Sequence, residues 1–312
     1  MAKISIGGQA VIEGVMMRAP NALAIAVRKP SGEVVVKEDV WRSLSRRLKF
    51  LKWPVIRGSV VLIETLINGF QALSFSANQA LEEGKGEEKL SSWTLSLVMA
   101  AAFGIGILFF VVLPHYLTGF LGYFIGREFR VESLSFHLVD GLIKVFFLVG
   151  YIYLISLLKD IQRIFQYHGA EHKSIYAYEA GEELTVSNAQ RHSTLHPRCG
   201  TAFLLIVLIV SIVFFAAFFP FLPKFPSLGK GLTNLIYVGI KLPLLFPIAG
   251  LAYEVIKFSG KKPNHPVLKM VLAPGLWLQC LTTREPTDDQ IEVALRALQG
   301  ALKIESRQEG VL

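Results

Sequence analysis

The chain has 312 residues, of which 52% are hydrophobic and only 18% are charged, and its mean hydropathy is +0.47. A soluble domain of this size carries more charge, so the composition excludes an ordinary soluble protein and predicts a polytopic membrane protein with soluble segments. The net charge of +8 is distributed by loop and does not form one basic surface. We therefore expect contact with a lipid bilayer and no nucleic-acid partner.

Residues 1–92 are predicted to form a small cytosolic α+β domain. Ala22–Val27 and Val34–Val40 are rich in β-branched and apolar residues, and the intervening KPSGE suits a turn with a glycine at positive φ. These features indicate a β-hairpin. Gly7–Arg18 is expected to add a strand or a glycine-hinged loop.

Glu13 is the one acidic residue of that apolar N-terminal stretch. Two interpretations are open for it. It either forms an ion pair with Arg18 or Arg28, or it is a catalytic residue that meets the histidines described below.

A polar stripe runs along the helix predicted over Pro54–Leu81. Its spacings of three, four and seven residues define one helical face, but the stripe is too polar for a lone span in lipid. We expect an interfacial helix, or one packed on the soluble domain, followed by a solvated linker over Glu82–Lys89. The stripe consists of Arg57, Glu64, Asn68, Gln71 and Asn78.

Four apolar stretches are each about as long as the roughly 20 residues needed to cross the hydrocarbon of a bilayer. Two of these spans fall in residues 93–158 and two in residues 200–258. The first is expected to end at Pro114, and the fourth to be interrupted by Pro243 and Pro247. The stretches are Trp93–Leu113, Phe136–Leu158, Gly200–Leu222 and Leu232–Phe258.

The distribution of lysine and arginine predicts the orientation of these spans. Residues 1–92, 159–199 and 257–312 hold 26 of them, whereas the loops 115–136 and 223–231 hold four. Basic residues accumulate on the cytosolic side. We therefore expect a multi-pass protein of the cytoplasmic (inner) membrane with both termini in the cytosol.

Four charged residues lie within the predicted spans, not counting Lys257 at the last turn of the fourth. Asp140 and Lys144 are four residues apart and can neutralise each other. Lys241 and Glu254 lie near enough to the ends of the fourth span for their side chains to reach the interface. We favour internal pairing of such charges over a transport path.

The stretch Gln166–Lys173, QYHGAEHK, carries the strongest functional signal. His168 and His172 are four residues apart and share one face of a helix, with Glu171 beside them. Two imidazoles one turn apart can bind a divalent metal such as zinc, and the carboxylate can act as general base, in the order of the inverted zinc-hydrolase motif. The alternative is a pair of ordinary interfacial histidines.

A second stretch, HPRCGT, adds His196 and Cys199 at the start of the third span. Histidine and cysteine at this spacing are common in metal sites. Glu179 lies seven residues past His172, on nearly the same helical face, and is the first candidate for an acidic ligand. We expect these residues to share one metal site with the first stretch.

The second span is expected to continue past the membrane surface. Lys159–Ala180 contains no proline and continues the helical pattern, and Gly181 is well placed to terminate the helix. The first histidine motif would then lie in a cytosolic segment, 159–199, level with the mouth of the third span.

Residues 259–312 are predicted to combine an interfacial segment with a cytosolic helix. His265–Thr283 is apolar but short for a span and contains Pro274, which fits an interfacial or re-entrant segment. Thr287 and Gln290 have the spacing of a capping box that opens a C-terminal helix. The apolar face of that helix should dock on the N-terminal domain and consists of Ile291, Ala294, Leu295, Leu298 and Leu302.

Four motifs in order, IGGQAVIEGVMMR, YHGAEHK, HPRCGT and LTTREP, resemble the DUF1385 family of bacterial, YqhQ-like membrane proteins. The resemblance covers nearly the whole chain, and four long motifs in one order make it specific. It implies a predicted metal-dependent enzyme and brings no substrate with it. The positions that it carries over are Glu13, His168, Glu171, His172, His196 and Cys199.

Three functions are open at this point. The first is a membrane-embedded metal-dependent hydrolase with Glu171 as base, and its motif on a helix next to a span favours a lipid-linked or membrane-peptide substrate. The second is a non-enzymatic scaffold or biogenesis factor, in which a metal or a hydrogen-bond network staples the cytosolic domain to the spans. The third, a small transporter, is the weakest because four spans show no internal repeat.

Overall fold

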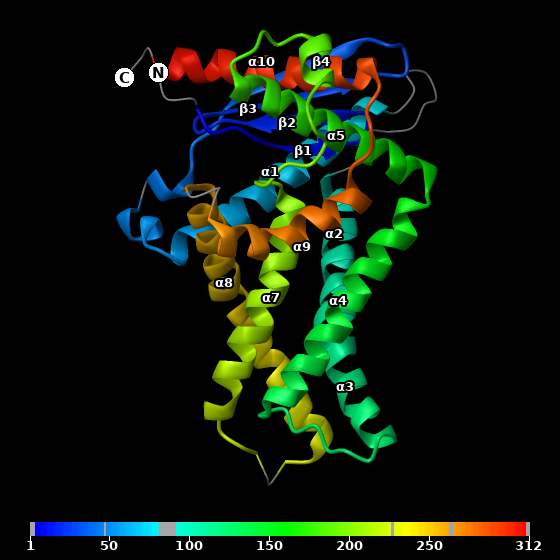
Figure 1. The fold of residues 1–312 in the computed structure, drawn as a ribbon, viewed down its shortest axis with the longest axis vertical. Helices are drawn as coiled ribbons and strands as arrows, with labels where there is room; N and C mark the ends of the chain where they lie inside the picture. The colour runs from blue at the N-terminus through cyan, green and yellow to red at the C-terminus, as the bar shows by residue number, and fades with distance from the viewer. Residues whose placement is uncertain (1–3, 47, 81–91, 226–227, 262–264, 310–312) are drawn as a thin grey trace.

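A computed structural model of the protein shows two parts along one long axis (Figure 1). At one end a four-stranded sheet has helices on both of its faces, and a bundle of apolar helices extends away from it. The predicted linker over Glu82–Lys89 lies outside the described residues. These are 4–46, 48–80, 92–225, 228–261 and 265–309.

The sheet is antiparallel throughout, with its strands in chain order. The predicted hairpin is confirmed, and Gly32 takes a φ of 88° in its turn. The stretch Gly7–Arg18 forms two strands joined by a tight turn, in which Glu13 has a φ of 53°. The strands are β1 (Gly7–Val11), β2 (Gly14–Arg18), β3 (Ala22–Arg28) and β4 (Val34–Val40).

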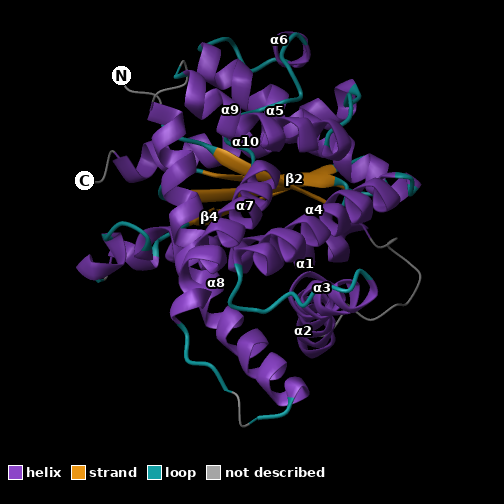
Figure 2. Ribbon diagram, turned by 60° about the horizontal axis from the view of Figure 1, so that its bottom comes forward, coloured by secondary structure: helices purple, strands orange, loops and turns teal. Residues whose placement is uncertain are grey.

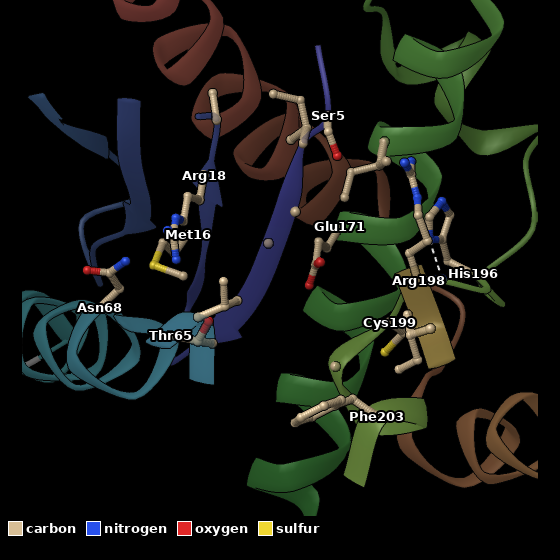
Figure 3. Close-up of a pocket in the computed structure, with 18 of the residues that line it drawn as sticks. Ser5, Met16, Arg18, Thr65, Asn68, Glu171, His196, Arg198, Cys199 and Phe203 are labelled. Carbon is tan, nitrogen blue, oxygen red and sulfur yellow. Dashed lines mark hydrogen bonds between the residues drawn. The ribbon is translucent and has the colours of Figure 1, made fainter. Parts of the chain in front are cut away.

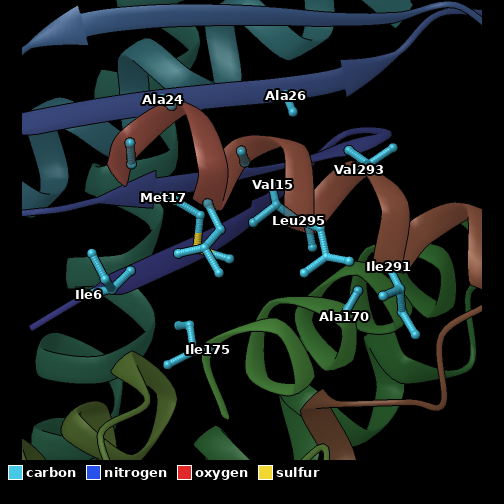
Figure 4. Packing of buried hydrophobic residues seen from close by; sticks show 14 of the residues in the cluster. Ile6, Val15, Met17, Ala24, Ala26, Ala170, Ile175, Ile291, Val293 and Leu295 are labelled. Atoms are coloured by element: carbon cyan, nitrogen blue, oxygen red, sulfur yellow. The ribbon is translucent and has the colours of Figure 1, made fainter. Parts of the chain in front are cut away.

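Alternating side chains give the sheet two apolar faces. One face packs on α5 (Lys159–Ala180) and α10 (Asp288–Glu309), and the other on α1 (Ile56–Ala80) (Figures 1 and 2). Figure 4 shows Val15 and the neighbouring strand residues against the apolar face of α10. The predicted docking of the C-terminal helix on the N-terminal domain is thus confirmed. Its start is capped, with Thr287 N donating to Gln290 Oε1 at 2.9 Å.

Five helices of the described chain are long and apolar enough to cross a membrane, by length and composition. The sequence predicted four, and the fifth is α1. The other four match the predicted spans: α2 (Ser92–Ile107) continued by the π-turn η3 (Leu108–Val112) and α3 (Leu113–Phe124); α4 (Leu134–Ser156); α7 (Gly200–Phe218) with the 3-10 turn η4 (Phe219–Phe221); and α8 (Lys230–Lys261).

Helix α1 differs from the other four in hydropathy and direction. Its mean hydropathy is 1.4, against 1.9 to 3.1 for the others, and it lies across the long axis between sheet and bundle (Figure 1). Its polar stripe is used in contacts: buried Glu64 accepts from Arg18 at 2.7 Å, and Arg57 Nε donates to Glu254 of α8 at 2.6 Å. The stripe therefore joins α1 to the sheet and to α8.

Three prolines do not end or interrupt helices, so those predictions are wrong. Pro114 follows the π-turn η3, and the helix continues to Phe124. A π-turn shifts the hydrogen bonds by one residue, which accommodates the proline ring and its missing N–H. Pro243 and Pro247 lie inside an unbroken α8, where neighbouring helices allow a transmembrane-type helix to tolerate proline.

The predicted continuous helix from the second span into α5 is also wrong. α4 ends at Ser156, and Leu158 has extended backbone, with φ −78° and ψ 130°, before α5 begins. Figure 1 shows α5 turned away from α4 to lie against the sheet, where it contacts β1 and α10. The bounds of α5 and its terminator are as predicted, because Gly181 has a φ of 79°.

The remaining elements connect these parts. α9 (Pro266–Thr282) lies across the long axis, beside the start of α7 (Figure 1). α6 (Val186–Gln190) belongs to the return loop between α5 and α7. Two 3-10 turns, η1 (Leu44–Arg46) and η2 (Lys49–Lys52), lead from the sheet into α1.

Three charged side chains of the described bundle are buried next to one another. The predicted pair of Asp140 and Lys144 is confirmed, with Lys144 Nζ 2.6 Å from Asp140 Oδ2. Lys241 is fully buried and its Nζ lies 3.2 Å from the same oxygen. Its side chain is therefore not directed to the interface, and the favoured internal pairing is confirmed.

Candidate metal centre

Segments that are distant in sequence meet between the sheet and the bundle. α5 carries His168 and His172, and the turn before α7 carries Cys199. The His168 and His172 rings have centroids 4.4 Å apart, and His168 Nε2 lies 3.1 Å from Cys199 Sγ. One ligand atom from each of the three residues lies within 4.8 Å of the others. The structure thus brings together three of the predicted ligands.

Backbone carbonyls fix both imidazole tautomers. His168 Nδ1 lies 2.8 Å from the carbonyl oxygen of Thr282, and His172 Nδ1 forms a hydrogen bond with the carbonyl oxygen of Thr194. A carbonyl can only accept, so each Nδ1 carries the hydrogen and each Nε2 keeps its lone pair. His172 Nε2 is buried and has no partner among the described residues. Metal-binding histidines are held in this way.

Cys199 is positioned by the helix that follows it. It is the N-cap residue of α7, and its sulphur accepts a hydrogen bond from Thr201 N at 3.3 Å. The positive end of a helix dipole stabilises negative charge at such a position. A buried sulphur there is a suitable anionic ligand for a soft or borderline divalent ion.

The three residues fit a tetrahedral metal in donor type and nearly in spacing. Ligand atoms around one zinc ion lie roughly 3.3–3.8 Å apart, given metal–ligand distances of about 2.0–2.3 Å. The present atoms need only a small contraction from their 4.8 Å limit. Burial lowers the pKa of His172, which keeps the imidazole neutral and able to bind a cation.

His196, predicted as a further ligand, lies beside the three-residue group. Its ring centroid is 5.6 Å from that of His172. Its Nδ1 accepts from Arg198 N at 3.3 Å, and its Nε2 lies 3.5 Å from Glu179. Glu179 also forms an ion pair with Arg198. The predicted ligand Glu179 is thus in contact with His196, at the edge of the cluster.

Glu171 is buried against the first strand. An added Cβ at Gly8 would lie 2.7 Å from the Glu171 carboxyl carbon, so a larger residue there would displace this side chain. Burial raises the pKa of Glu171, opposed in part by the charges of His168 and His196. Figure 3 shows Glu171 on the same side of the cavity as His196 and Cys199.

The structure places Glu13 away from the three-residue group. Its carboxylate pairs with Arg163 of α5, with Arg163 Nη2 2.6 Å from Glu13 Oε2, and it accepts from Tyr167 Oη at 3.2 Å. The predicted partners, Arg18 and Arg28, are wrong: both pair with other carboxylates, Arg18 with that of Glu64. Glu13 lies on a turn directed towards the side of α5, which the sequence could not reveal.

Several residues that support the site were not predicted. An added Cβ at Gly169 would lie 2.1 Å from the Arg284 carbonyl oxygen, so this glycine lets the segment after α9 reach α5. That approach places Thr282 on His168. The side-chain amide of Gln279, on α9, makes two hydrogen bonds of 2.8 Å to the backbone of His196. Its Oε1 accepts from His196 N, and its Nε2 donates to the His196 carbonyl oxygen. The motif LTTREP contains Thr282 and was the available signal, although its role was not apparent.

A cavity of about 510 Å³ adjoins the cluster. His172, His196, Cys199 and Glu171 line one side of it, together with Arg198. Figure 3 shows the opposite side formed by the sheet and α1. Polar side chains on that side are Arg18 and Asn68, and Asn68 is buried with neither amide atom hydrogen-bonded in the described structure. The remaining lining is largely apolar and includes Ile6, Met16, Val61, Leu62, Ile175, Phe203 and Ile256.

Comparison with known proteins assigns the family. Residues 53–304 match the sequence profile of the family described as "Protein of unknown function (DUF1385)". The chain is 34% identical over 314 residues to "Uncharacterized protein YqhQ" of Bacillus subtilis (strain 168), covering 97% of this chain and 94% of that protein. No solved structure matches the chain. The chain belongs to the DUF1385 family.

Proposed function

We propose that this DUF1385 protein is a metal-dependent hydrolase of the cytoplasmic membrane that acts at the cytosolic interface on a lipid-linked or membrane-peptide substrate. The observation that carries the proposal is the convergence of three ligand atoms beside a cavity, with Glu171 on the same side of it. Three protein ligands leave one position open, as in catalytic zinc sites, whereas structural sites use four.

The metal would be held by His168, His172 and Cys199. A divalent ion such as Zn²⁺ would supply Lewis-acid activation of water and of the bond to be cleaved. The chain contributes the orientation of both imidazoles through the carbonyls of Thr282 and Thr194. This prior orientation reduces the rearrangement needed to bind the ion.

Glu171 would accept the proton of the attacking water. A carboxylate with a raised pKa is a stronger base than an exposed one, and Glu171 is buried beside the cavity. Gly8 keeps the carboxylate in one place, because the first strand packs directly over it. The expected contribution of such a base is about 10²–10⁴ in rate.

The membrane assignment is supported by where the basic and apolar segments lie. The sheet, α5 and α10 lie at one end of the molecule, and these belong to the segments richest in lysine and arginine. The apolar helices α2–α3, α4, α7 and α8 extend from that end (Figure 1). With the basic end in the cytosol, both termini are cytosolic, α1 and α9 lie at the interface, and four helices cross.

The cavity next to the ligands supports the proposed substrate class. Its lining combines apolar side chains such as Met16 and Phe203 with the charged Arg18 and Arg198. The cavity lies between α1 and the start of α7. With α1 at the membrane interface, as proposed, it would open at the level where acyl chains meet headgroups. An amphiphile with an apolar chain and an anionic or polar group fits such a lining.

Hydrolysis can be tested before the substrate is identified. Purified protein is incubated with membrane vesicles of a deletion strain in water labelled with heavy oxygen, and products are examined by mass spectrometry. A hydrolase transfers the label into a product. Glu171→Gln should lose this labelling and keep its metal, whereas Glu182→Gln, an exposed carboxylate outside the cavity, should behave as wild type. Absence of labelled product with metal-loaded wild type would refute hydrolysis.

A scaffold is the second candidate, because the cluster joins three segments of the chain. His168 contacts Thr282 across 114 residues and His172 contacts Thr194 across 22. A metal bound there would link α5 to the start of α7 and so hold the sheet domain against the bundle. In that case Glu171→Gln would restore function in a deletion strain as well as wild type, while His168→Ala would fail with a loss of folded protein.

A further inference from the structure

A second buried polar cluster lies in the helix bundle, on α3, α4 and α8, away from the candidate metal centre. Asp140 is the carboxylate at its centre. Lys144 Nζ and Lys241 Nζ lie 2.6 and 3.2 Å from the same oxygen, Asp140 Oδ2. The three residues are 1%, 5% and 0% exposed. Two lysines therefore share one carboxylate in a buried setting.

With both lysines protonated, this arrangement has one positive charge more than negative. Two ammonium groups against one carboxylate give an excess of one unit, and a buried excess charge is costly. Lys241 Nζ also lies 5.3 Å from the ring centre of Phe136 and 5.7 Å from that of Phe215. Aromatic faces reduce the cost without neutralising the charge. An anion nearby would neutralise it.

His115 adds a directed donor to this cluster. Its Nδ1 lies 3.1 Å from Lys241 Nζ. An ammonium group can only donate, so Nδ1 accepts and the ring hydrogen is on Nε2. His115 is 1% exposed, and Nε2 has no hydrogen-bond partner among the described residues. Asn234 lines the same cavity and lies beside the His115 ring, but no hydrogen bond of normal geometry reaches Nε2. The N–H therefore needs an acceptor from the cavity.

The cavity that His115 borders has a volume of about 880 Å³. It is formed by α3, the loop between α3 and α4, and the start of α8, at the end of the molecule opposite the sheet (Figure 1). Arg127 and Arg130 of that loop line it, and neither side chain has an ion pair or hydrogen bond in the described structure.

The two carboxylates of the lining are already engaged. Glu132 accepts from Tyr237 Oη at 2.9 Å, and Glu128 lies 3.9 Å from Lys230 Nζ. Among the described residues of the lining, the two guanidinium groups and the His115 N–H are donors without a side-chain partner. Two planar guanidinium groups and an imidazole N–H match the several oxygens of a phosphate better than a single halide ion.

We propose that this cavity binds an oxyanion of the phosphate class, held by Arg127 and Arg130 with the Nε2–H of His115 as a buried donor, in front of the excess charge of the lysine pair. The anion is either free phosphate or the headgroup of a phospholipid, which share this chemistry. The site is independent of the candidate metal centre and of the hydrolysis proposed there.

The test uses the full chain in micelles of a maltoside detergent, which contains no phosphate. Sodium phosphate is titrated against sodium chloride at equal ionic strength, with calorimetry and the thermal unfolding midpoint as readouts. Wild type should bind phosphate saturably and more tightly than chloride. In a second arm, phosphatidylglycerol added to the micelles without free phosphate should raise the midpoint if the headgroup is the ligand. Either response supports the site, and the two arms separate its sources.

Matched variants locate the binding. Arg127→Ala with Arg130→Ala removes two exposed guanidinium groups and should weaken binding at least about tenfold, as expected for lost charged hydrogen bonds. Arg42→Ala with Arg191→Ala removes the same charge at the other end and should bind as wild type. His115→Phe keeps a ring, removes the donor and should also weaken binding about tenfold.

Two results would overturn the proposal. One is a wild-type protein that responds to neither phosphate nor phosphatidylglycerol. This includes the case in which its thermal unfolding midpoint changes with pH but with neither ligand. That case would identify the lysine cluster as a proton-binding site. The other is an Arg127→Ala, Arg130→Ala double variant that binds as tightly as the Arg42→Ala, Arg191→Ala control. The double variant changes only exposed loop residues, so the test does not depend on His115→Phe folding.

Discussion

Two histidine sites, one between the sheet and the bundle and one inside the bundle, are prepared for ligands of opposite charge. At the sheet end, backbone carbonyls accept from Nδ1 of His168 and His172, so the lone pairs of Nε2 face the cysteine. In the bundle, Lys241 occupies Nδ1 of His115, so an N–H remains for the cavity. The residue type is the same, and the partner of the other nitrogen decides which ligand it suits.

The neighbours strengthen this contrast. The sheet-end site contains a cysteine at a helix N-terminus and the buried Glu171, both suited to a cation and its chemistry. The bundle site contains two lysines that share Asp140. Histidine spacing alone indicates the first site and misses the second, because His115 is on α3 whereas its partner Lys241 is on α8.

The largest expected effect is on metal content. His168→Ala removes one of three ligands, and since loss of a supporting residue alone costs about 10–100-fold in metal affinity, this loss should exceed 100-fold. Protein purified without chelator should then contain about one ion per chain in wild type and none in the variant. His192→Ala is the control, because that histidine pairs with Glu182 outside the cluster. Equal metal content in both variants would show that His168 is not a metal ligand, and the first site would not be a cation site.

The next effect tests the bundle charges. Asp140→Asn leaves two buried lysines without a carboxylate and should lower the free energy of unfolding by about 3–5 kcal/mol, read as a shift of the denaturant midpoint in detergent. Adding Lys241→Met should recover part of the loss. Asp39→Asn, an exposed carboxylate, is the control. If Asp140→Asn were as stable as Asp39→Asn, Lys144 and Lys241 could not both carry a buried positive charge.

A smaller change should separate Glu171 from the ligands. Gly8→Ala would place a methyl group 2.7 Å from the Glu171 carboxyl carbon and displace it. A displacement near 1 Å can cost about 10² in rate. We expect heavy-oxygen labelling to fall by that order while metal content is unchanged. Gly7→Ala, which meets nothing within 4 Å, should label as wild type. Full labelling by Gly8→Ala would mean that the position of Glu171 is unimportant.

The smallest effect concerns the close approach behind His168. In Gly169→Ala, the new Cβ would lie 2.1 Å from the Arg284 carbonyl oxygen, and such overpacking typically costs about 1–3 kcal/mol. The midpoint of thermal unfolding should fall and metal affinity should weaken. Gly150→Ala, in α4 with open space, should be neutral or stabilising by up to about 1 kcal/mol. A neutral Gly169→Ala would show that the segment after α9 does not hold His168.

Local patterns predicted much of the architecture. The Ala22–Val40 hairpin, the start and apolar face of α10 and the bounds of α5 all depend on residues a few positions apart. Predictions failed where a distant segment decides the outcome. α5 turns away from α4 because the sheet binds it, and Lys241 is buried because Asp140 lies beside it on another helix. Pro114 is tolerated because a π-turn precedes it.

The sequence by itself determined which chemical groups this protein has and which of them share a helical face, since the spacing of His168, Glu171 and His172 on α5 is a local property. Only the tertiary structure decided what those groups can bind. The hydrogen bond of His168 to Thr282 spans 114 residues, and that of Lys241 to His115 spans 126. The physical reason is that an imidazole can present either a lone pair or an N–H. The choice depends on a hydrogen-bond partner that no local pattern specifies.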